Sequence, residues 1–179
     1  SLKAVGSFVW ELAKVFLYAL LIIVPLRVFI AEPFIVSGSS MVPNFHNREY
    51  LIVDKVTYRF SEPERGDIII FKYPKDPKQY FIKRIVGLPG DTVVLRDGGV
   101  IIYNPEHPQG QKLDEQYLPD QRVTSGSEDP VTLGSEEYYV MGDNRQASSD
   151  SRFWGVLPKF DFVGKVSVRV FPLSNFSIT

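Results

Sequence analysis

Three short segments of this chain carry side chains that can do chemistry. The first, SGSSMVP over residues 37–43, places three hydroxyls beside a glycine, between an apolar segment and a proline. Such a loop can hold a serine in an exposed pose, and glycine lets the backbone approach a substrate carbonyl closely. Most Ser/Gly clusters of this kind are ordinary turns. The loop therefore becomes a candidate nucleophile loop only if a base lies near one of its hydroxyls.

The chain offers two kinds of base. Only two histidines are present, and His46, six residues after Ser40, has no obvious orienting partner, which favours a surface histidine. The other candidate is Lys83 within YFIKRIVG, where strand alternation places it on one face with Phe81 and Ile85. Burial there would lower the lysine pKa from about 10.4 to about 8, at a cost of roughly 3 kcal/mol. Periodicity alone favours the alternative, a solvated lysine on a strand edge.

The third segment, GDNRQASSDSR over residues 142–152, combines two acids, two arginines and three serines in a loop that starts with glycine. Charge pairs such as Asp150 with Arg84 or Arg152 can fix loops around a site, and a serine hydroxyl can hold a neutral lysine by a hydrogen bond. The alternative is a solvated turn whose surface ion pairs contribute little to stability.

Taken in order, these segments give the chain a specific resemblance. SGSSMVP, GDIIIFKYP, YFIKRIVGLPGD and GDNRQASSDSRFWG follow one another behind an N-terminal apolar segment, and this order resembles the bacterial type I signal peptidases. The resemblance covers most of residues 34–155, while 96–135 resembles only the variable second part of that family. It implies a serine endopeptidase with a Ser/Lys dyad on a mostly β fold of antiparallel sheets behind a transmembrane helix. It also implies cleavage of signal peptides from exported preproteins, without metal or cofactor.

Residue by residue, the resemblance implies that Ser40 is the nucleophile and Lys83 its base, with the Ser148 hydroxyl orienting the lysine amine. The matching supporting positions are Gly142 as a backbone hinge and the ion-pair residues Arg84, Asp143, Arg145, Asp150 and Arg152. Some family members use a serine hydroxyl in the oxyanion hole at the position that is Gly38 here. Oxyanion binding by backbone, chiefly the Ser40 N–H, is therefore expected, and help from Ser37 or Ser39 stays open.

Substrate binding is expected between two strands. An extended peptide laid between residues 34–38 and 79–83 would pair through its backbone, with alternate side chains in shallow pockets. By resemblance these pockets take the small −1 and −3 residues of signal peptides and are lined by Phe34, Val36, Met41, Phe45 and Ile82. Phe45 stands where the family commonly has leucine and would narrow the −1 pocket. Plain core packing explains any one of these apolar residues equally well.

The N-terminal segment of residues 8–30 is dominated by large apolar side chains and contains an unbroken apolar run from Val15 to Leu26. A membrane-spanning helix needs about 20 apolar residues, so this run spans only together with its flanks, where Lys14 and Arg27 can reach the headgroups. We expect a single-pass anchor in the bacterial cell membrane, with the catalytic domain on the extracytoplasmic side. A buried helix of a soluble core and the apolar region of a signal peptide are the alternatives.

From residue 32 onward the pattern changes to short β-branched and aromatic runs separated by Gly, Pro and Asp, which predicts a mostly β fold. We expect an anchor over 1–31, a catalytic core over 32–95 and 136–179, and an inserted region over 96–135. Residues 104–130 are polar and rich in Pro and Gly, which predicts an excursion that is partly ordered at best. No helix is expected after the anchor. The predicted strands are 34–36, 50–58, 67–73, 79–86, 92–95, 100–103, 137–141 and 163–171.

Composition narrows the classes of function. The chain has 179 residues, a formal net charge of −1 and 13% aromatic residues, which argues against a nucleic-acid binder and against a disordered tail. The absence of cysteine excludes a disulfide scaffold, cysteine-ligated zinc and a thiol nucleophile, and two histidines make a metal site unexpected. The expected partners are preproteins and the lipid bilayer.

Two rival functions remain open from the sequence. One is a membrane-anchored β module that binds peptides without cutting them. The other keeps the Ser/Lys chemistry but applies it to self-cleavage or to one dedicated precursor.

Overall fold

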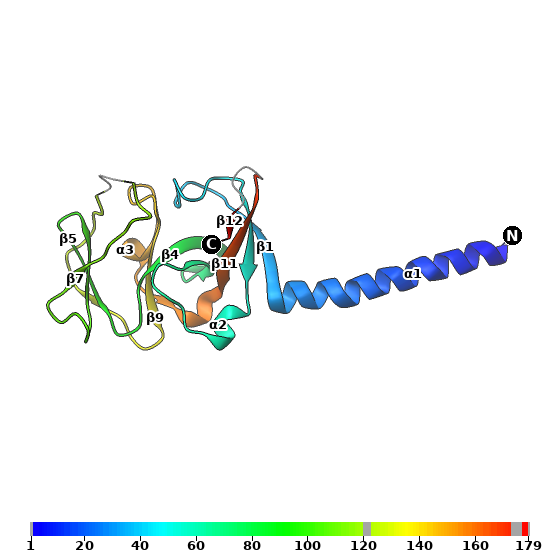
Figure 1. The fold of residues 1–179 in the computed structure, drawn as a ribbon, viewed down its shortest axis with the longest axis horizontal. Helices are drawn as coiled ribbons and strands as arrows, with labels where there is room; N and C mark the ends of the chain where they lie inside the picture. Colours follow the sequence, from blue (N-terminus) through cyan, green and yellow to red (C-terminus); the bar gives the residue numbers. More distant parts are fainter. Residues whose placement is uncertain (1, 120–122, 173–176, 179) are drawn as a thin grey trace.

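The computed structural model describes residues 2–119, 123–172 and 177–178. Figure 1 shows a β domain from which one long helix projects, and within the described residues the β domain contains two antiparallel sheets. The expectation of a mostly β fold with antiparallel sheets behind an N-terminal helix is confirmed.

Helix α1 (Leu2–Pro25) continues into a π-helical turn, η1 (Leu26–Ile30), before the first strand. Its segment Val5–Pro25 has 21 residues and a mean hydropathy of 2.0, and none of that segment is buried inside the structure. At about 1.5 Å per residue this length matches the apolar thickness of a bilayer. Because the helix packs against nothing else in the described residues, it is not the buried core helix of this chain.

The larger sheet carries the central strands of the domain. Its strand order is β1-β2-β11-β3-β4-β9-β10, and β12 also pairs with β11. The ring centroids of Phe34 on β1 and Tyr80 on β4 lie 5.5 Å apart although these strands are not neighbours in the sheet, so the sheet curls and brings them together. Its strands are β1 (Ala31–Ile35), β2 (Tyr50–Asp54), β3 (Ile68–Tyr73), β4 (Asp76–Gly87), β9 (Glu137–Met141), β10 (Leu157–Pro158), β11 (Phe162–Phe171) and β12 (Ser177–Ile178).

The smaller sheet has the strand order β7-β6-β5-β8 and lies on the side of the domain away from α1 (Figure 1). It shares a buried apolar cluster with the larger sheet, to which Val86 and Met141 contribute from β4 and β9. This packing fixes the two sheets against each other. Its strands are β5 (Thr92–Arg96), β6 (Gly99–Tyr103), β7 (Gln111–Lys112) and β8 (Val131–Thr132).

The expectation of no helix after the anchor is wrong in three short places: α2 (Thr57–Phe60), α3 (Ser151–Trp154) and the 3-10 turn η2 (Lys159–Asp161). The strand predicted over 50–58 therefore ends at Asp54. The Asp54 carboxylate accepts hydrogen bonds from the backbone N–H groups of Val56 and Thr57, at 2.6 and 3.0 Å. Such local side-chain bonds compete with the strand ladder and start a turn instead.

The excursion over residues 104–130 is also better packed than expected, where it is described; residues 120–122 lie outside the described residues. Thr124 is buried, and the side chain of Glu115 is almost buried because it contacts Arg145 of the third sequence segment. These contacts could not be read from periodicity because they join residues far apart in the chain.

Candidate active site

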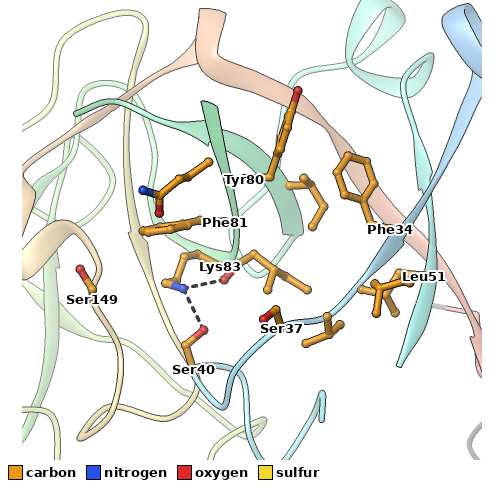
Figure 2. A pocket seen from close by; sticks show the side chains of 13 residues that line it. Phe34, Ser37, Ser40, Leu51, Tyr80, Phe81, Lys83 and Ser149 are labelled. Carbon is orange, nitrogen blue, oxygen red and sulfur yellow. Dashed lines mark hydrogen bonds between the residues drawn. The ribbon is translucent and has the colours of Figure 1, made fainter. Parts of the chain in front are cut away.

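Ser40 and Lys83 meet at the centre of the site. The Lys83 Nζ lies 2.9 Å from the Ser40 Oγ and 2.8 Å from the carbonyl oxygen of Ile82 (Figure 2). Lys83 belongs to β4, which pairs with β3 on one side and β9 on the other, and its side chain is only 3% exposed. The strand-edge, solvated lysine is therefore excluded.

Burial lowers the pKa of Lys83 to about 8, and the charges of Asp150 and Asp143 oppose this shift. The amine lies 5.2 Å from the ring centroid of Phe81, as expected from their shared strand face. Because desolvation disfavours the ammonium, a substantial fraction of this lysine is neutral near pH 8. A neutral amine at 2.9 Å from a hydroxyl can accept its proton.

The loop that carries Ser40 is anchored in the core. Met41 and Phe45 are buried in an apolar cluster with residues of β2, β3 and β4, so they hold the loop from below and do not line the site cavity. Val36 and Ile82 belong to the same cluster and do line the cavity, so a place in this cluster is compatible with a role beside the substrate. Gly38 has a φ of +99°, which a side chain would strain, and its N–H donates to the Asn47 Oδ1 at 3.0 Å.

The third segment, residues 142–152, is hydrogen-bonded to the Ser40 loop. The Asn144 backbone N–H donates to the Ser40 carbonyl at 2.9 Å, and its side-chain amide donates to the Ser39 carbonyl at 3.1 Å. A Cβ placed on Gly142 would lie 2.2 Å from the Ser148 Oγ and 2.5 Å from the Ser40 carbonyl oxygen. Gly142 is thus required by close packing, not by a positive φ, at the point where both loops meet.

The ion pairs around the site sort into two bidentate pairs. Arg84 binds Asp143 through Nε–Oδ1 at 2.9 Å and Nη2–Oδ2 at 2.7 Å. Asp150 binds Arg152 rather than Arg84, with both contacts at 2.8 Å, and also accepts the Gly142 N–H at 3.0 Å. All four side chains are almost completely buried, so the loop carrying them is held rigidly.

Arg145 points to residues that the sequence analysis missed. Its guanidinium contacts Glu115 and Thr124 in the excursion and donates from Nε to the Gly142 carbonyl at 3.1 Å. Tyr117, also in the excursion, lies with its ring centroid 4.0 Å from the Arg84 Cζ. The signal in the sequence was the presence of arginines in the loop, which does not say where the partner of each one lies.

Ser148 of the third segment lies differently from expectation, and Ser149 was not anticipated at the site. The Ser148 Oγ is buried and has no hydrogen-bond partner among the described residues, so it does not bind the Lys83 amine in this structure. Ser149, which the sequence analysis did not single out, lines the site cavity (Figure 2).

His46, the other candidate base, lies on the surface. The His46 Nδ1 lies 3.7 Å from a Glu49 carboxylate oxygen, and its side chain is 55% exposed. Its side chain makes no hydrogen bond with Ser40 among the described residues, which agrees with a surface histidine. Nowhere in the described residues do three His, Cys, Asp or Glu side chains come together as a metal site requires.

A cavity of about 460 Å³ opens beside Ser40 between β1 and β4. Of the expected pocket residues, Phe34, Val36 and Ile82 line it; Leu51 and Ile70 from β2 and β3 also line it. Within the described residues β1 pairs only with β2, and β9 pairs with β4 only from Arg84 onward. Two strand edges with unpaired backbone groups therefore face this cavity, which suits an extended peptide.

The mostly β fold, the buried amine beside a serine hydroxyl and the open strand edges define the class of a serine endopeptidase. A family model described as "Signal peptidase, peptidase S26" matches residues 9–171. The chain belongs to this family, and within it to the type I signal peptidases.

Curated relatives are similar to this chain over most of their own length. A probable signal peptidase I-2 from Synechocystis is 36% identical over 94% of this chain and 76% of its own. Signal peptidase I P from Bacillus subtilis subsp. natto is 34% identical over 97% of this chain and 95% of its own. Among solved structures, a signal peptidase I from Enterococcus faecalis is 29% identical, with a TM-score of 0.49, and covers 60% of this chain and 98% of its own.

Proposed function

We propose that this chain is a membrane-anchored peptidase that removes signal peptides from exported preproteins after translocation, with Ser40 as nucleophile and neutral Lys83 as general base. The observation that carries the proposal is the 2.9 Å contact between the Ser40 Oγ and a buried lysine amine whose pKa is lowered to about 8. Family membership independently supports a serine endopeptidase and removes the rival of a binding module that does not cut.

In the proposed reaction, the Lys83 amine accepts the Ser40 proton while the Oγ attacks the scissile carbonyl carbon. The resulting ammonium donates a proton to the leaving amine as the peptide C–N bond breaks, leaving an acyl-enzyme on Ser40. The neutral amine then takes a proton from water as the water attacks the ester carbonyl. Return of that proton to the Ser40 Oγ releases the acid and restores the dyad.

The oxyanion of both tetrahedral intermediates would be bound by backbone, chiefly by the Ser40 N–H, which has no hydrogen-bond partner among the described residues. Of the two serines that could add a hydroxyl to the oxyanion hole, Ser37 is favoured because it lines the cavity, whereas Ser39 does not. Ser148 is proposed to receive a hydrogen bond from the lysine amine during the reaction, since its buried hydroxyl is otherwise unpartnered.

The supporting residues act through position. Arg84 with Asp143, and Arg152 with Asp150, hold the loop that contains Gly142 and Asn144 against the two carbonyls of the nucleophile loop. Arg145 extends this support to the excursion through Glu115. Since attack geometry tolerates little displacement, these contacts are proposed to set the turnover rate without touching substrate.

The substrate is proposed to lie between β1 and β4 as an added strand. Phe34, Val36 and Ile82 would border its −1 and −3 side chains, with Leu51 and Ile70 as further apolar lining. Shallow apolar pockets admit small side chains and exclude large ones, which is the proposed basis for cutting after a small residue.

The anchor and the orientation are proposed on physical grounds. The exposed apolar surface of Val5–Pro25 requires an apolar environment, and a bilayer supplies it. We place the catalytic domain on the extracytoplasmic side, where translocated preproteins emerge. The division into an anchor over 1–31, a core over 32–95 and 136–179, and an inserted region over 96–135 is part of this proposal.

The test of the dyad is cleavage of a preprotein in detergent by the wild type and by Ser40→Ala, Lys83→Ala and His46→Ala variants, followed by mass analysis of the product. The wild type and His46→Ala are expected to cut after a small residue, and the other two to be inactive. Full activity of Lys83→Ala would place the base elsewhere.

Substrate range needs a separate experiment. Several unrelated preproteins, each with small residues at −1 and −3, are incubated with the wild type. General processing predicts that most are cut at their own signal-peptide boundary, and a dedicated protease predicts that one is cut.

A further inference from the structure

A second cavity lies on the same face of the larger sheet as the candidate active site. It has a volume of about 470 Å³, and Tyr80 lines both cavities. On β3, Ile70 lines the first cavity and Lys72 the second; on β1, Phe34 lines the first and Glu32 the second. Lys55, the residue after β2, also lines the second cavity. Residues two or four apart on a strand share a face. The groove therefore continues past Tyr80 and changes from apolar to basic.

The lining of this basic cavity has an excess of positive charge. Arg59 and Lys72 form no ion pair within the described residues, although each faces the same space. Cations held together without matching carboxylates create a positive potential that attracts an anion. The charged residues that line the cavity are the four cations Lys55, Arg59, Lys72 and Lys159 and the single carboxylate Glu32.

Carboxylates around the cavity offset part of this charge; one of them, Asp67, accepts a hydrogen bond from the lining residue Tyr58 and is itself paired with Lys165. Glu32 pairs with Lys55 at 3.2 Å, and Glu62, whose side chain is 80% exposed, pairs with Lys159 at 2.5 Å. Asp161 is buried outside the lining and interacts with the Lys72 charge. The exposed pair is screened by water and salt, so the cavity retains a net positive charge.

The basic cavity lies where the apolar helix ends. The Lys55 backbone N–H donates to the carbonyl of Ile30, the last residue of η1, at 2.9 Å. Glu32 follows that residue by two positions on β1, and α2 begins two residues after Lys55. Figure 1 shows α2 on the part of the β domain next to the junction of α1 and β1. The cavity is thus at the level expected for the headgroups of a bilayer that α1 spans.

Two exposed aromatic rings flank the basic cavity. Phe60 in α2 and Phe160 in η2 are 86% and 84% exposed, and each directly follows a cavity cation, Arg59 and Lys159. Apart from α1, the described residues contain no large apolar side chain that is more exposed. Cations beside apolar rings are the pattern of a surface that lies in the membrane interface, with charge at the phosphates and rings at the acyl boundary.

We propose that this basic cavity binds the headgroup of an anionic phospholipid from the bilayer that anchors the chain, with Phe60 and Phe160 entering the edge of the acyl region. The inference rests on the proposed anchoring by α1. Binding at this site would fix the height of the β domain above the bilayer. The groove between β1 and β4 would then open toward the membrane past Tyr80, where an incoming signal peptide emerges.

The test titrates short-chain phosphatidylglycerol, and in parallel short-chain phosphatidylcholine, into the full chain in a neutral detergent, with calorimetry as the readout. Phosphatidylglycerol is expected to bind more tightly. An Arg59→Gln/Lys72→Gln variant is expected to weaken its binding by about 30-fold, because each cation near an anionic lipid contributes about 1 kcal/mol. An Arg59→Lys/Lys72→Arg variant keeps both charges and should retain binding.

The matched control removes two cations far from the anchor, Arg96→Gln/Lys112→Gln on the smaller sheet, and should leave lipid binding unchanged (Figure 1). Cleavage of a soluble peptide in lipid-free detergent reports folding of each variant and is expected to be unaltered.

Three results would overturn the inference: equal affinity of the wild type for both lipids, equal loss in the control variant, or displacement of phosphatidylglycerol by free glycerol phosphate, which would indicate a site for soluble phosphates. A wild type that binds phosphatidylglycerol but cuts no preprotein would instead contradict the proposed function alone.

Discussion

At the scale of single residues, burial in the folded protein disfavours the charged form of Lys83. Its pKa is lowered to about 8 chiefly by burial, against the opposing charges of Asp150 and Asp143. If its neutral amine is the base, kcat/KM rises with pH and levels off above an apparent pKa of about 8. The measurement is the pH profile of peptide cleavage between pH 6 and 10. A profile controlled by a group near pH 6.5, and its loss in His46→Ala, would point to histidine instead.

The same burial predicts how stability depends on pH. Because the folded-state pKa of Lys83 is about 8, below the value of 10.5 for an unperturbed lysine, the unfolded chain binds more protons between these two pH values. Unfolding free energy therefore rises with pH across that window, and the penalty is fully present below it. A Lys83→Met variant should be inactive but more stable than the wild type near pH 7, by up to about 3 kcal/mol.

That gain should shrink as the pH is raised from 8 toward 10.5. Urea unfolding of the two proteins at pH 7 and pH 10 measures it. A gain that is equal at both pH values would show that the lysine charge is not the cause.

Gly142 gives a prediction about close packing. A methyl group there would meet the Ser148 Oγ at 2.2 Å and the Ser40 carbonyl oxygen at 2.5 Å, so the nucleophile loop must move. Gly142→Ala should reduce kcat by about 100-fold or more, as expected for a misplacement near 1 Å. Steady-state kinetics on a peptide substrate measure this.

Gly134→Ala is the matched control for that variant, because its added Cβ would meet only the end of the Glu137 side chain, at 3.2 Å. Its kinetics should match the wild type. Normal kcat in Gly142→Ala would mean that the two loops are not held as tightly as their contacts indicate.

At the scale of elements, the excursion between β6 and β9 acts as a brace for the site. The Arg145 side chain is 1% exposed, and Glu115 supplies its carboxylate partner. Removal of one partner leaves a buried charge unpaired, which typically costs about 3–5 kcal/mol. Glu115→Ala should therefore lower unfolding stability by about that amount and also reduce kcat, because the third segment loosens.

Glu128→Ala is the comparison within the same excursion. Glu128 is 68% exposed and pairs with the half-exposed Arg96 at 3.5 Å, so its loss should change stability by less than about 1 kcal/mol. Equal effects of the two variants on stability and kcat would contradict the brace.

At the scale of the whole molecule, the apolar helix in the described residues and the β domain that follows it predict that the two ends of this helix lie on opposite sides of the membrane. Since the chain has no cysteine, single cysteines can report each side without background. Lys112→Cys, in the β domain, should react with an impermeant maleimide in intact spheroplasts. Lys3→Cys, at the start of α1 and before its apolar span Val5–Pro25, should react only after permeabilisation. The reverse pattern would invert the proposed orientation.

Features that depend on local pattern could be predicted from the amino-acid sequence. Alternation in residues 79–86 predicted that Lys83 shares a strand face with Phe81, and the lysine amine lies 5.2 Å from that ring. Two of the segments chosen for their chemistry also meet, since the Lys83 Nζ lies 2.9 Å from the Ser40 Oγ. The apolar length of α1 and the mostly β pattern are likewise local properties. The order of the four motifs supplied the family.

Contacts between residues far apart in the chain could not be predicted and become visible in the folded structure. Periodicity could not show that Lys83 is buried, because its burial comes from β3, β9 and the Ser40 loop packing around it. Nor could it choose Arg152 over Arg84 for Asp150, find Glu115 for Arg145, or place Met41 and Phe45 in the core below the cavity. Charge pairing and packing depend on distances in space, and these are set only when the sheet curls and the loops close over it.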